Sequence, residues 1–136
     1  MLDKYIEVRY IIGNKYIEVR YNKLEESMKE RLKRIYIPMT ETGFYILFCL
    51  QEEMHGYNIV QKVKQMTLGE IEISPGTMYG SLSKMERDEL IQFIKEQDNR
   101  KYYCITPLGK EILNTELKRI ERIYHNSKGE DINEKI

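Results

Sequence analysis

The fold is decided by the stretch Ser74-Pro75-Gly76-Thr77-Met78-Tyr79-Gly80-Ser81-Leu82, which carries both the start and part of the buried face of a helix. Serine is a favoured N-cap, and a proline at the first helical position loses no hydrogen bond. Met78, Leu82 and Met85 then recur at i, i+4 and i+7, which predicts a single buried face. The stretch therefore predicts a helix of about four turns, long enough to carry a recognition surface.

Two helices are predicted upstream of this stretch. Thr40 or Thr42 can cap an apolar helix that runs to about Glu53 and is buried nearly all round. After a break at His55-Gly56, the chain shows the spacing of a second amphipathic helix. Its apolar residues are Tyr57, Ile59, Val60, Val63 and Met66. The connector 67–73 has room for a short strand.

A β-hairpin and a long last helix are predicted downstream. The β-rich runs 90–94 and 101–105 flank Asp98-Asn99-Arg100, a pattern typical of a hairpin with a basic tip. Thr106-Pro107 repeats the cap-and-proline start, for a helix that runs to about His125. A coiled-coil-like seam is predicted on that helix. The residues of this seam are Leu113, Leu117, Ile120 and Tyr124.

Three helices, a hairpin and a further helix are the order of a winged helix-turn-helix followed by a dimerisation helix. We therefore expect a mainly α fold with a small β-hairpin wing. The expected regions are an N-terminal extension at 1–36, the winged helix-turn-helix at 37–105, the dimerisation helix at 106–127 and a flexible acidic tail at 128–136.

The N-terminal extension holds an exact duplication, because Lys4 to Tyr10 and Lys15 to Tyr21 both read KYIEVRY. Each copy alternates apolar and polar residues around Gly13-Asn14, which favours a β-hairpin. A second interpretation concerns the gene. Residues 24–28, LEESM, can be encoded by a purine-rich GGAGGA stretch just before an ATG, as at a bacterial ribosome-binding site. Translation would then begin at Met28, and the intact mass of the natively expressed product separates the two interpretations.

Composition excludes several classes of protein. With 41% hydrophobic and 32% charged residues, the chain can bury a core and stay soluble. The longest apolar run, 44–50, falls far short of the ~20 residues of a membrane span, and the charged N-terminus lacks a secretory signal. We expect a cytoplasmic protein with no membrane partner.

The sequence also contains no recognisable motif for catalysis or for binding a cofactor. It contains no phosphate-binding glycine loop and no nucleophile motif, so we expect no enzyme activity. Cys49 and Cys104 lack metal-ligand spacing and are expected to be buried thiols. We expect no metal site and no cofactor.

Contact with DNA is predicted from the free side of the helix at Ser74. Helices of this length fit the major groove, and Gly76 and Gly80 would let this one approach phosphates closely. The net charge of the chain is zero, so attraction to DNA would depend on local clusters of basic residues and not on the overall charge. The predicted polar face of the helix consists of Thr77, Ser81, Lys84 and Asp88. The predicted wing tip carries Arg100, Lys101 and Tyr102, which would contact the backbone.

Five spaced motifs resemble the PadR family of transcriptional repressors, over about residues 37–124. The motifs are His55-Gly56-Tyr57, Ser74 to Tyr79, Leu90-Ile91, Arg100 to Tyr103 and Thr106 to Gly109. The resemblance implies a homodimer that represses from an inverted-repeat operator of double-stranded DNA. It also implies release of the DNA on binding a small aromatic or cationic effector.

Carried over position by position, the resemblance implies specific contacts. It implies that Ser74, Gly76, Thr77 and Tyr79 lie at the DNA, that Tyr57 lies near the backbone, and that Arg100 and Lys101 lie in the wing. The resemblance also includes a departure, because the family often has proline at the position of Gly80. The glycine found here would loosen the helix. The C-terminal part is short, so an effector pocket would have to form between protomers.

One alternative from another functional class stays open. A winged helix can also serve as a protein-docking module without DNA binding, and the neutral net charge is compatible with that role. Salt distinguishes the two, because DNA binding weakens steeply as the salt concentration rises.

Overall fold

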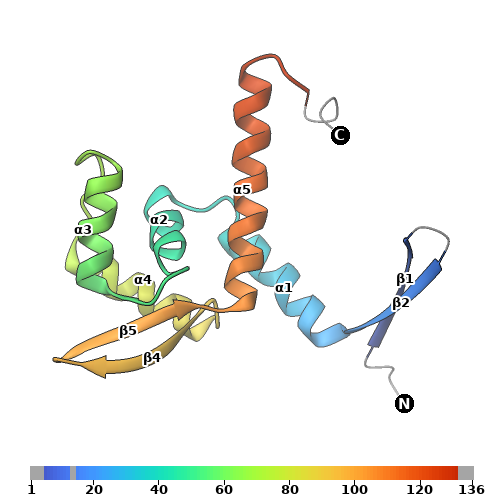
Figure 1. The fold of residues 1–136 in the computed structure, drawn as a ribbon, viewed down its shortest axis with the longest axis horizontal. Helices are drawn as coiled ribbons and strands as arrows, with labels where there is room; N and C mark the ends of the chain where they lie inside the picture. The colour runs from blue at the N-terminus through green and yellow to red at the C-terminus, as the bar shows by residue number, and fades with distance from the viewer. Residues whose placement is uncertain (1–4, 13–14, 132–136) are drawn as a thin grey trace. The chain divides into compact units, whose positions relative to one another are not determined.

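The structure is a computed structural model that describes residues 5–12 and 15–131. Two units divide the chain, Met1–Ile35 and Tyr36–Ile136, and each is described by itself. The first contains strands β1 (Tyr5–Ile12) and β2 (Lys15–Asn22) and nearly all of helix α1 (Lys23–Tyr36) (Figure 1).

Strands β1 and β2 pair antiparallel, which confirms the hairpin predicted from the duplication. The register is centred on Val8 opposite Val19, two equivalent positions of the repeat, and it sets Glu7 opposite Arg20. Equivalent residues of the two copies thus lie opposite each other at Val8 and Val19. The predicted turn at Gly13-Asn14 lies outside the described residues.

The second unit contains a mainly helical fold with a three-stranded antiparallel sheet in the order β3-β5-β4. Its elements are α2 (Glu41–Cys49), β3 (Met54–His55), α3 (Gly56–Met66), α4 (Pro75–Arg87), β4 (Ile91–Gln97), β5 (Arg100–Ile105) and α5 (Pro107–Ser127). The β4–β5 hairpin extends to one side of the helices (Figure 1). This arrangement confirms the predicted winged helix-turn-helix. In the described part of the chain, every helix is too short or too polar to cross a membrane.

Three of the predicted N-caps are confirmed. The hydroxyls of Thr40, Ser74 and Thr106 accept hydrogen bonds from backbone N–H groups three residues on, at 3.0, 3.2 and 3.0 Å. Each satisfies one N–H that a helix start otherwise leaves without a partner. Local sequence therefore determines where α2, α4 and α5 begin.

Two details of the predicted fold were wrong. Helix α2 ends at Cys49 and not near Glu53, because the chain turns there to form the short strand β3. The connector 67–73 contains no strand: Leu68 and Gly69 have φ angles of 52° and 82°, and the Thr67 hydroxyl accepts the N–H of Ile71. The third strand is β3, which pairs with β5.

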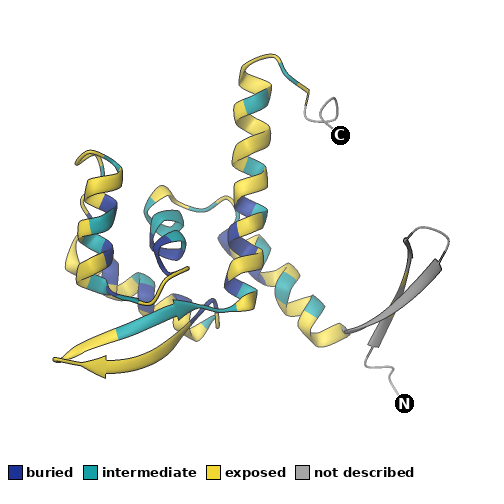
Figure 2. Cartoon of the chain, in the orientation of Figure 1, coloured by how far each residue is buried: buried dark blue, intermediate teal, exposed yellow. Residues whose placement is uncertain are grey.

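The core is formed by the facing sides of α2, α3, α4 and α5 and the start of β4 (Figure 2). Met78, Leu82 and Met85 are buried, as predicted for α4. They meet apolar residues of the neighbouring elements: Ile46, Leu47, Cys49, Leu50, Ile59, Val63, Leu90, Ile91, Ile112 and Leu113. The buried side of α4 is thereby fixed, and its opposite side stays free.

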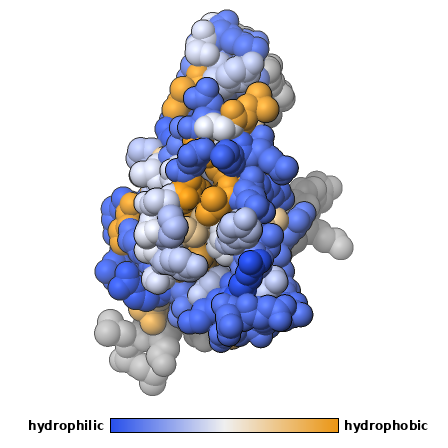
Figure 3. Space-filling view, turned by 90° about the vertical axis from the view of Figure 1, so that its left-hand side faces the viewer, coloured by the Kyte–Doolittle hydropathy of each residue, from blue (hydrophilic) through white to orange (hydrophobic). Residues whose placement is uncertain are grey.

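The buried residues of helix α5 all lie in its first half, and its second half is mostly exposed (Figure 2). Leu113, predicted as part of the dimer seam, is instead fully buried in the core of its own unit. The apolar residues that stay exposed on α5 are Leu117, Ile120, Ile123 and Tyr124, each between 39% and 54% exposed. Hydrophobic side chains are visible on the upper part of the molecule, where α5 extends (Figure 3).

A buried carboxylate fixes α5 to the segment before α2. Glu116 is 1% exposed, accepts the N–H of Met39 at 3.3 Å and receives two hydrogen bonds from Arg119 at 2.8 and 2.6 Å. The hydrogen bonds from Arg119 hold the pKa of Glu116 below its usual range, against the opposing effect of burial. A buried charge is tolerated here because it is paired and hydrogen-bonded.

Candidate nucleic-acid interface

The free side of α4 is a ridge of four residues that lies opposite its buried face. At 100° per residue, the positions farthest from Met78, Leu82 and Met85 are Gly76, Gly80, Ser83 and Arg87. All four are exposed, and we call them the outer ridge of α4. A methyl group on Gly76 or Gly80 would have no atom of the protein within 4 Å. Ser83 and Arg87 were missed from the sequence, although a half-turn offset from the buried face could have found them.

The residues predicted to read bases lie on one flank of this ridge. Thr77 is exposed, and its hydroxyl oxygen accepts a hydrogen bond from Ser74 at 3.0 Å. Ser81 is only half-buried, and the Lys84 ammonium lies 4.7 Å from the centre of the Tyr36 ring. This cation–π contact holds Lys84 at the side of the helix.

Asp88 lies at the end of the same flank and turns toward its own protein. Its carboxylate accepts a hydrogen bond from the Tyr36 hydroxyl at 2.5 Å. Burial, followed by this hydrogen bond, raises the pKa of Tyr36 far above its ordinary value. Asp88 therefore ends α4 and anchors Tyr36, and it is not free for a base edge as the sequence had indicated.

The turn at the tip of the wing is formed by two residues, Asp98 and Asn99, with left-handed backbone conformation. Asp98 and Asn99 have φ angles of 54° and 60°, as a two-residue hairpin turn requires, and Asn and Asp tolerate this conformation well. The turn delivers Arg100 to the first position of β5. A bulge between Phe93 and Lys95 shifts the register of β4 against β5. The structure thus confirms the predicted position of the turn, with Arg100 and Lys101 at the start of β5, while its role in DNA binding stays a prediction.

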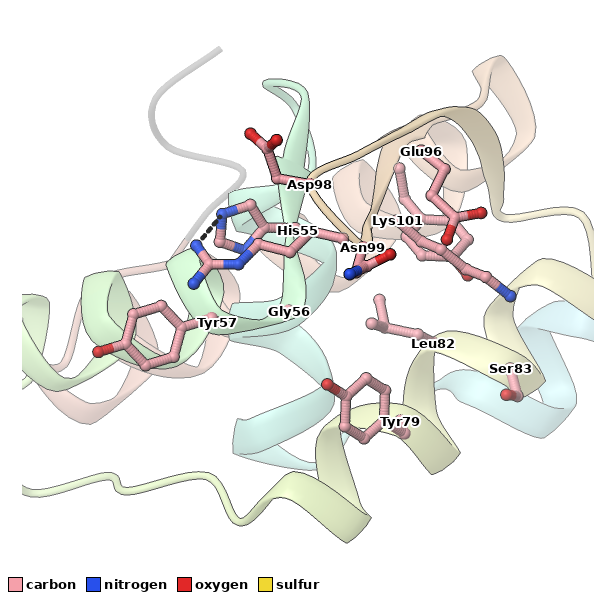
Figure 4. Close-up of a pocket in the computed structure, with 12 residues that line it drawn as sticks. His55, Gly56, Tyr57, Tyr79, Leu82, Ser83, Glu96, Asp98, Asn99 and Lys101 are labelled. Atoms are coloured by element: carbon pink, nitrogen blue, oxygen red, sulfur yellow. Dashed lines mark hydrogen bonds between the residues drawn. The ribbon is translucent and has the colours of Figure 1, made fainter.

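A groove of about 620 Å³ separates the wing from α4 and the start of α3. Tyr57 of α3, Tyr79 and Ser83 of α4, and Arg100 and Lys101 of the wing line it (Figure 4). Four residues predicted separately as DNA contacts, Tyr57, Tyr79, Arg100 and Lys101, are thus brought to one concave surface. Glu96 and Asp98 line the wing side as well, so the charge of the groove is mixed.

The remaining predicted residues are not among those that line this groove. Ser74, Gly76 and Thr77 are exposed at the start of α4, whereas Tyr102 is half-buried. The Lys95 ammonium lies 4.9 Å from the ring centre of Tyr102. Among the described residues, no group of three or more His, Cys, Asp and Glu side chains could hold a metal ion.

His55 links the start of α3 to the wing. It is 4% exposed, its Nδ1 accepts the N–H of Asn58 at 3.2 Å, and its Nε2 lies 3.3 Å from Nη1 of Arg100. Burial, and then the charge of Arg100, lower the pKa of His55. The folded protein therefore favours the neutral imidazole.

This pKa shift predicts a loss of stability in mild acid. A histidine whose pKa is lower in the folded than in the unfolded state stabilises the fold fully above its ordinary pKa of about 6.5, and that contribution is lost as the pH falls through the folded pKa. We expect the free energy of unfolding, measured in urea, to fall as the pH drops below about 6.5. His55→Asn, which keeps an N-cap acceptor, should flatten this part of the profile. An unchanged slope in that variant would contradict the assignment to His55.

Comparisons with known proteins agree with this architecture. Residues 46–115, about half of the chain, match the family model described as the transcriptional regulator PadR-like family. The transcriptional regulator YqjI of Escherichia coli is 26% identical over 78 residues, covering 57% of this chain and 38% of that protein. Over the curated relatives it matches, the chain spans from a fifth to two thirds of their length.

Two solved structures extend the comparison. A PadR family transcription regulator from Clostridium difficile is 29% identical with a TM-score of 0.53, covering 65% of this chain and 97% of that one. Bacillus subtilis PadR in complex with operator DNA is 26% identical with a TM-score of 0.50, covering 55% and 45%. Family model and fold agree, so the chain belongs to the PadR-like family of transcriptional regulators.

Proposed function

We propose that this chain binds operator DNA as a homodimer and represses transcription, with α4 in the major groove and the wing on the adjacent backbone. The observation that carries the proposal is the groove in which α3, α4 and the wing tip bring Tyr57, Tyr79, Arg100 and Lys101 together. The similarity to Bacillus subtilis PadR, which was crystallised with operator DNA, supports the same use of the fold.

Base reading falls to the outer ridge of α4 and its Lys84 flank. Arginine and lysine can donate to guanine O6 and N7 in the major groove, and serine and threonine can bond several base edges. Arg87 and Ser83 are exposed on the ridge, with Thr77 and Lys84 beside them. Lys84 leaves a single cation–π contact when it reaches for DNA, which costs little at an exposed site.

Phosphate contacts come from the start of α4 and from the wing. The N–H of Thr77 is used by the Ser74 cap, whereas Gly76 presents its N–H at a helix end that favours anions. Arg100 and Lys101 supply the cations across the groove, and the hydroxyls of Tyr57 and Tyr79 can donate to phosphate oxygens.

Dimerisation and regulation are assigned to α5. Its exposed stripe of Leu117, Ile120, Ile123 and Tyr124 is apolar and suits a second copy of the same helix. A dimer would present two α4 helices to the two halves of an inverted repeat. A small aromatic or cationic effector that binds between the protomers would change their spacing and release the operator.

The decisive experiment is binding to the promoter of the chain's own gene as a function of salt. A DNA reader that makes several phosphate contacts loses about a thousandfold or more in affinity between 50 and 200 mM salt. We expect that steep dependence, together with protection of an inverted repeat. Weak binding that ignores both salt and sequence would instead favour a protein-docking module.

A pair of glycine variants tests the close approach of α4. Gly76→Ala should leave the free energy of unfolding unchanged or raise it by up to about 1 kcal/mol, because alanine favours helix and the new methyl contacts nothing. Operator affinity should nevertheless fall about tenfold, since the methyl holds a phosphate away from the first-turn amide. Fluorescence anisotropy and urea unfolding measure the two effects.

Gly80→Ala is the matched control, one turn further along the same ridge. Its methyl also contacts nothing in the protein, and in mid-helix it should raise the free energy of unfolding by about 1 kcal/mol. We expect operator affinity to stay within about twofold, because the N–H of Gly80 lies beyond the first turn and is used within the helix. Equal losses in both variants would show that the close approach is not confined to the first turn.

A further inference from the structure

His55, Tyr57, Arg100 and Tyr102 form a cluster at the edge of the groove, which we call the His55–Arg100 cluster. The His55 ring meets the Tyr102 ring edge-on, with centroids 5.1 Å apart, and the two residues are opposite each other in the β3–β5 ladder. The guanidinium carbon of Arg100 lies 5.2 Å from the centre of the Tyr57 ring. Figure 4 marks the contact between His55 and the guanidinium with a dashed line.

The N–H of Asn58 and the guanidinium of Arg100 face the two nitrogens of the His55 ring, but a neutral ring can accept a hydrogen bond at only one of them. A neutral imidazole has one nitrogen that accepts and one that donates, whereas a guanidinium only donates. Nδ1 accepts the N–H of Asn58 as the cap of α3, so the proton of the neutral ring is on Nε2. Nε2 is the atom that faces Arg100 at 3.3 Å. His55 therefore borders the guanidinium without binding it strongly.

Within residues 5–12 and 15–131, Arg100 also forms no salt bridge, although Glu96 and Asp98 line the same groove. Its contacts among the described residues are with His55 and with the face of the Tyr57 ring. Lys95 of the same wing provides a contrast, because its ammonium lies 3.1 Å from the carboxylate of Glu53. A cation held by aromatic surfaces keeps its hydrogen-bond donors for another ligand.

We infer that His55 is a positioning residue for DNA binding: its ring and the Tyr57 ring border the guanidinium of Arg100 and restrict where it can lie, so that it stays at the groove, ready for a phosphate of the DNA backbone. The inference rests on the proposed function and adds a residue that makes no DNA contact itself. A long side chain that is already ordered loses less conformational entropy when it binds. Removing the His55 ring should therefore weaken binding through Arg100 alone.

A double-mutant cycle tests this coupling. Arg100→Ala should lower affinity for the promoter fragment about tenfold and reduce the salt slope by about one phosphate contact. His55→Asn keeps the cap of α3, because asparagine is a favoured N-cap, but removes the ring beside the guanidinium. We expect H55N alone to lower affinity about fivefold on account of the freed arginine. We expect H55N/R100A to bind no worse than R100A.

Independent effects would overturn the inference. If H55N lowers affinity by the same factor with and without Arg100, His55 acts only by supporting α3. If H55N alone leaves the affinity unchanged, His55 does not position Arg100 for DNA binding. Tyr57→Leu guards against a folding defect, since Tyr57 is 56% exposed and its removal leaves the cap intact. Part of its effect should likewise vanish in the R100A background, and full additivity in that cycle also counts against the inference.

Failure of the proposed function would look different. The unaltered chain would then show no salt-dependent binding to the promoter fragment, and R100A would have no effect. Normal binding by the unaltered chain and a clear loss in R100A, together with an additive H55N, would reject the role of His55 alone.

Discussion

Leu117→Glu combined with Ile120→Glu is expected to convert the proposed dimer to a monomer and to lower affinity for the proposed inverted repeat by at least about 100-fold. Both side chains lie on the exposed stripe of α5, 39% and 40% exposed, so the folded unit itself does not need them. Facing glutamates at the centre of a dimer seam would be buried like charges, which costs several kcal/mol. A monomer that binds one half-site also loses the effective concentration that links the two halves, worth about 10²–10⁴ in affinity.

Sedimentation gives the oligomeric state, and anisotropy on the full repeat and on one half-site gives the affinities. The matched control is Asn114→Glu with Asn126→Glu, which makes the same charge change at exposed positions on another side of α5. It should remain a dimer. If the stripe variant also remains a dimer, or if it becomes a monomer and still binds the full repeat normally, α5 is not the dimer seam.

The elements of the fold that could be predicted from sequence are those with local causes. Ser74 and Thr106 cap α4 and α5 as expected, because a cap needs only a hydroxyl three residues before an N–H. The wing turn likewise follows from Asp98 and Asn99 themselves. The strand β3 was missed because two residues have no periodicity of their own, and only their pairing with β5 makes them a strand.

The site could be predicted only as separate parts. The sequence indicated the basic wing tip and the helix at Ser74 but not that Tyr57, from another helix, shares a groove with them. Asp88 and Leu113 were assigned to surfaces because their helical spacing fits. Asp88 instead accepts a hydrogen bond from Tyr36, which is 52 residues away in the sequence. Leu113 instead packs in the core, which only the tertiary fold assembles. Periodicity gives the face of a helix but not what covers it.

Gly109→Ala is the second variant with a large expected effect, and this effect is on folding. Gly109 is buried in the first turn of α5, where its N–H donates to the Thr106 hydroxyl at 3.0 Å. Thr106 in turn donates from its N–H to the carbonyl of Leu90 at 3.0 Å and from its hydroxyl to the carbonyl of Glu89 at 2.6 Å. Two hydrogen bonds from Thr106 thus fix the start of α5 to Glu89 and Leu90, just before β4.

A methyl group on Gly109 would overlap the carbonyl oxygen of Leu90, a backbone atom, and would press on the Ile105 side chain. The Leu90 carbonyl cannot move aside without weakening its bond to Thr106, so the clash cannot relax cheaply. Overpacking of this kind costs about 1–3 kcal/mol and sometimes more, out of a total stability of about 5–15 kcal/mol. We expect Gly109→Ala to cost about 3 kcal/mol, the upper end of the overpacking range, because the atom that the methyl group meets belongs to the backbone.

Urea unfolding of Gly109→Ala should therefore show a lower midpoint, whereas Gly76→Ala, the same substitution in open space, should not. Because Gly109 lies where the first turn of α5 packs against Leu90, a partly folded variant would also misplace α5, and operator binding should fall together with stability. Wild-type stability in Gly109→Ala would mean that α5 and β4 are not so closely apposed.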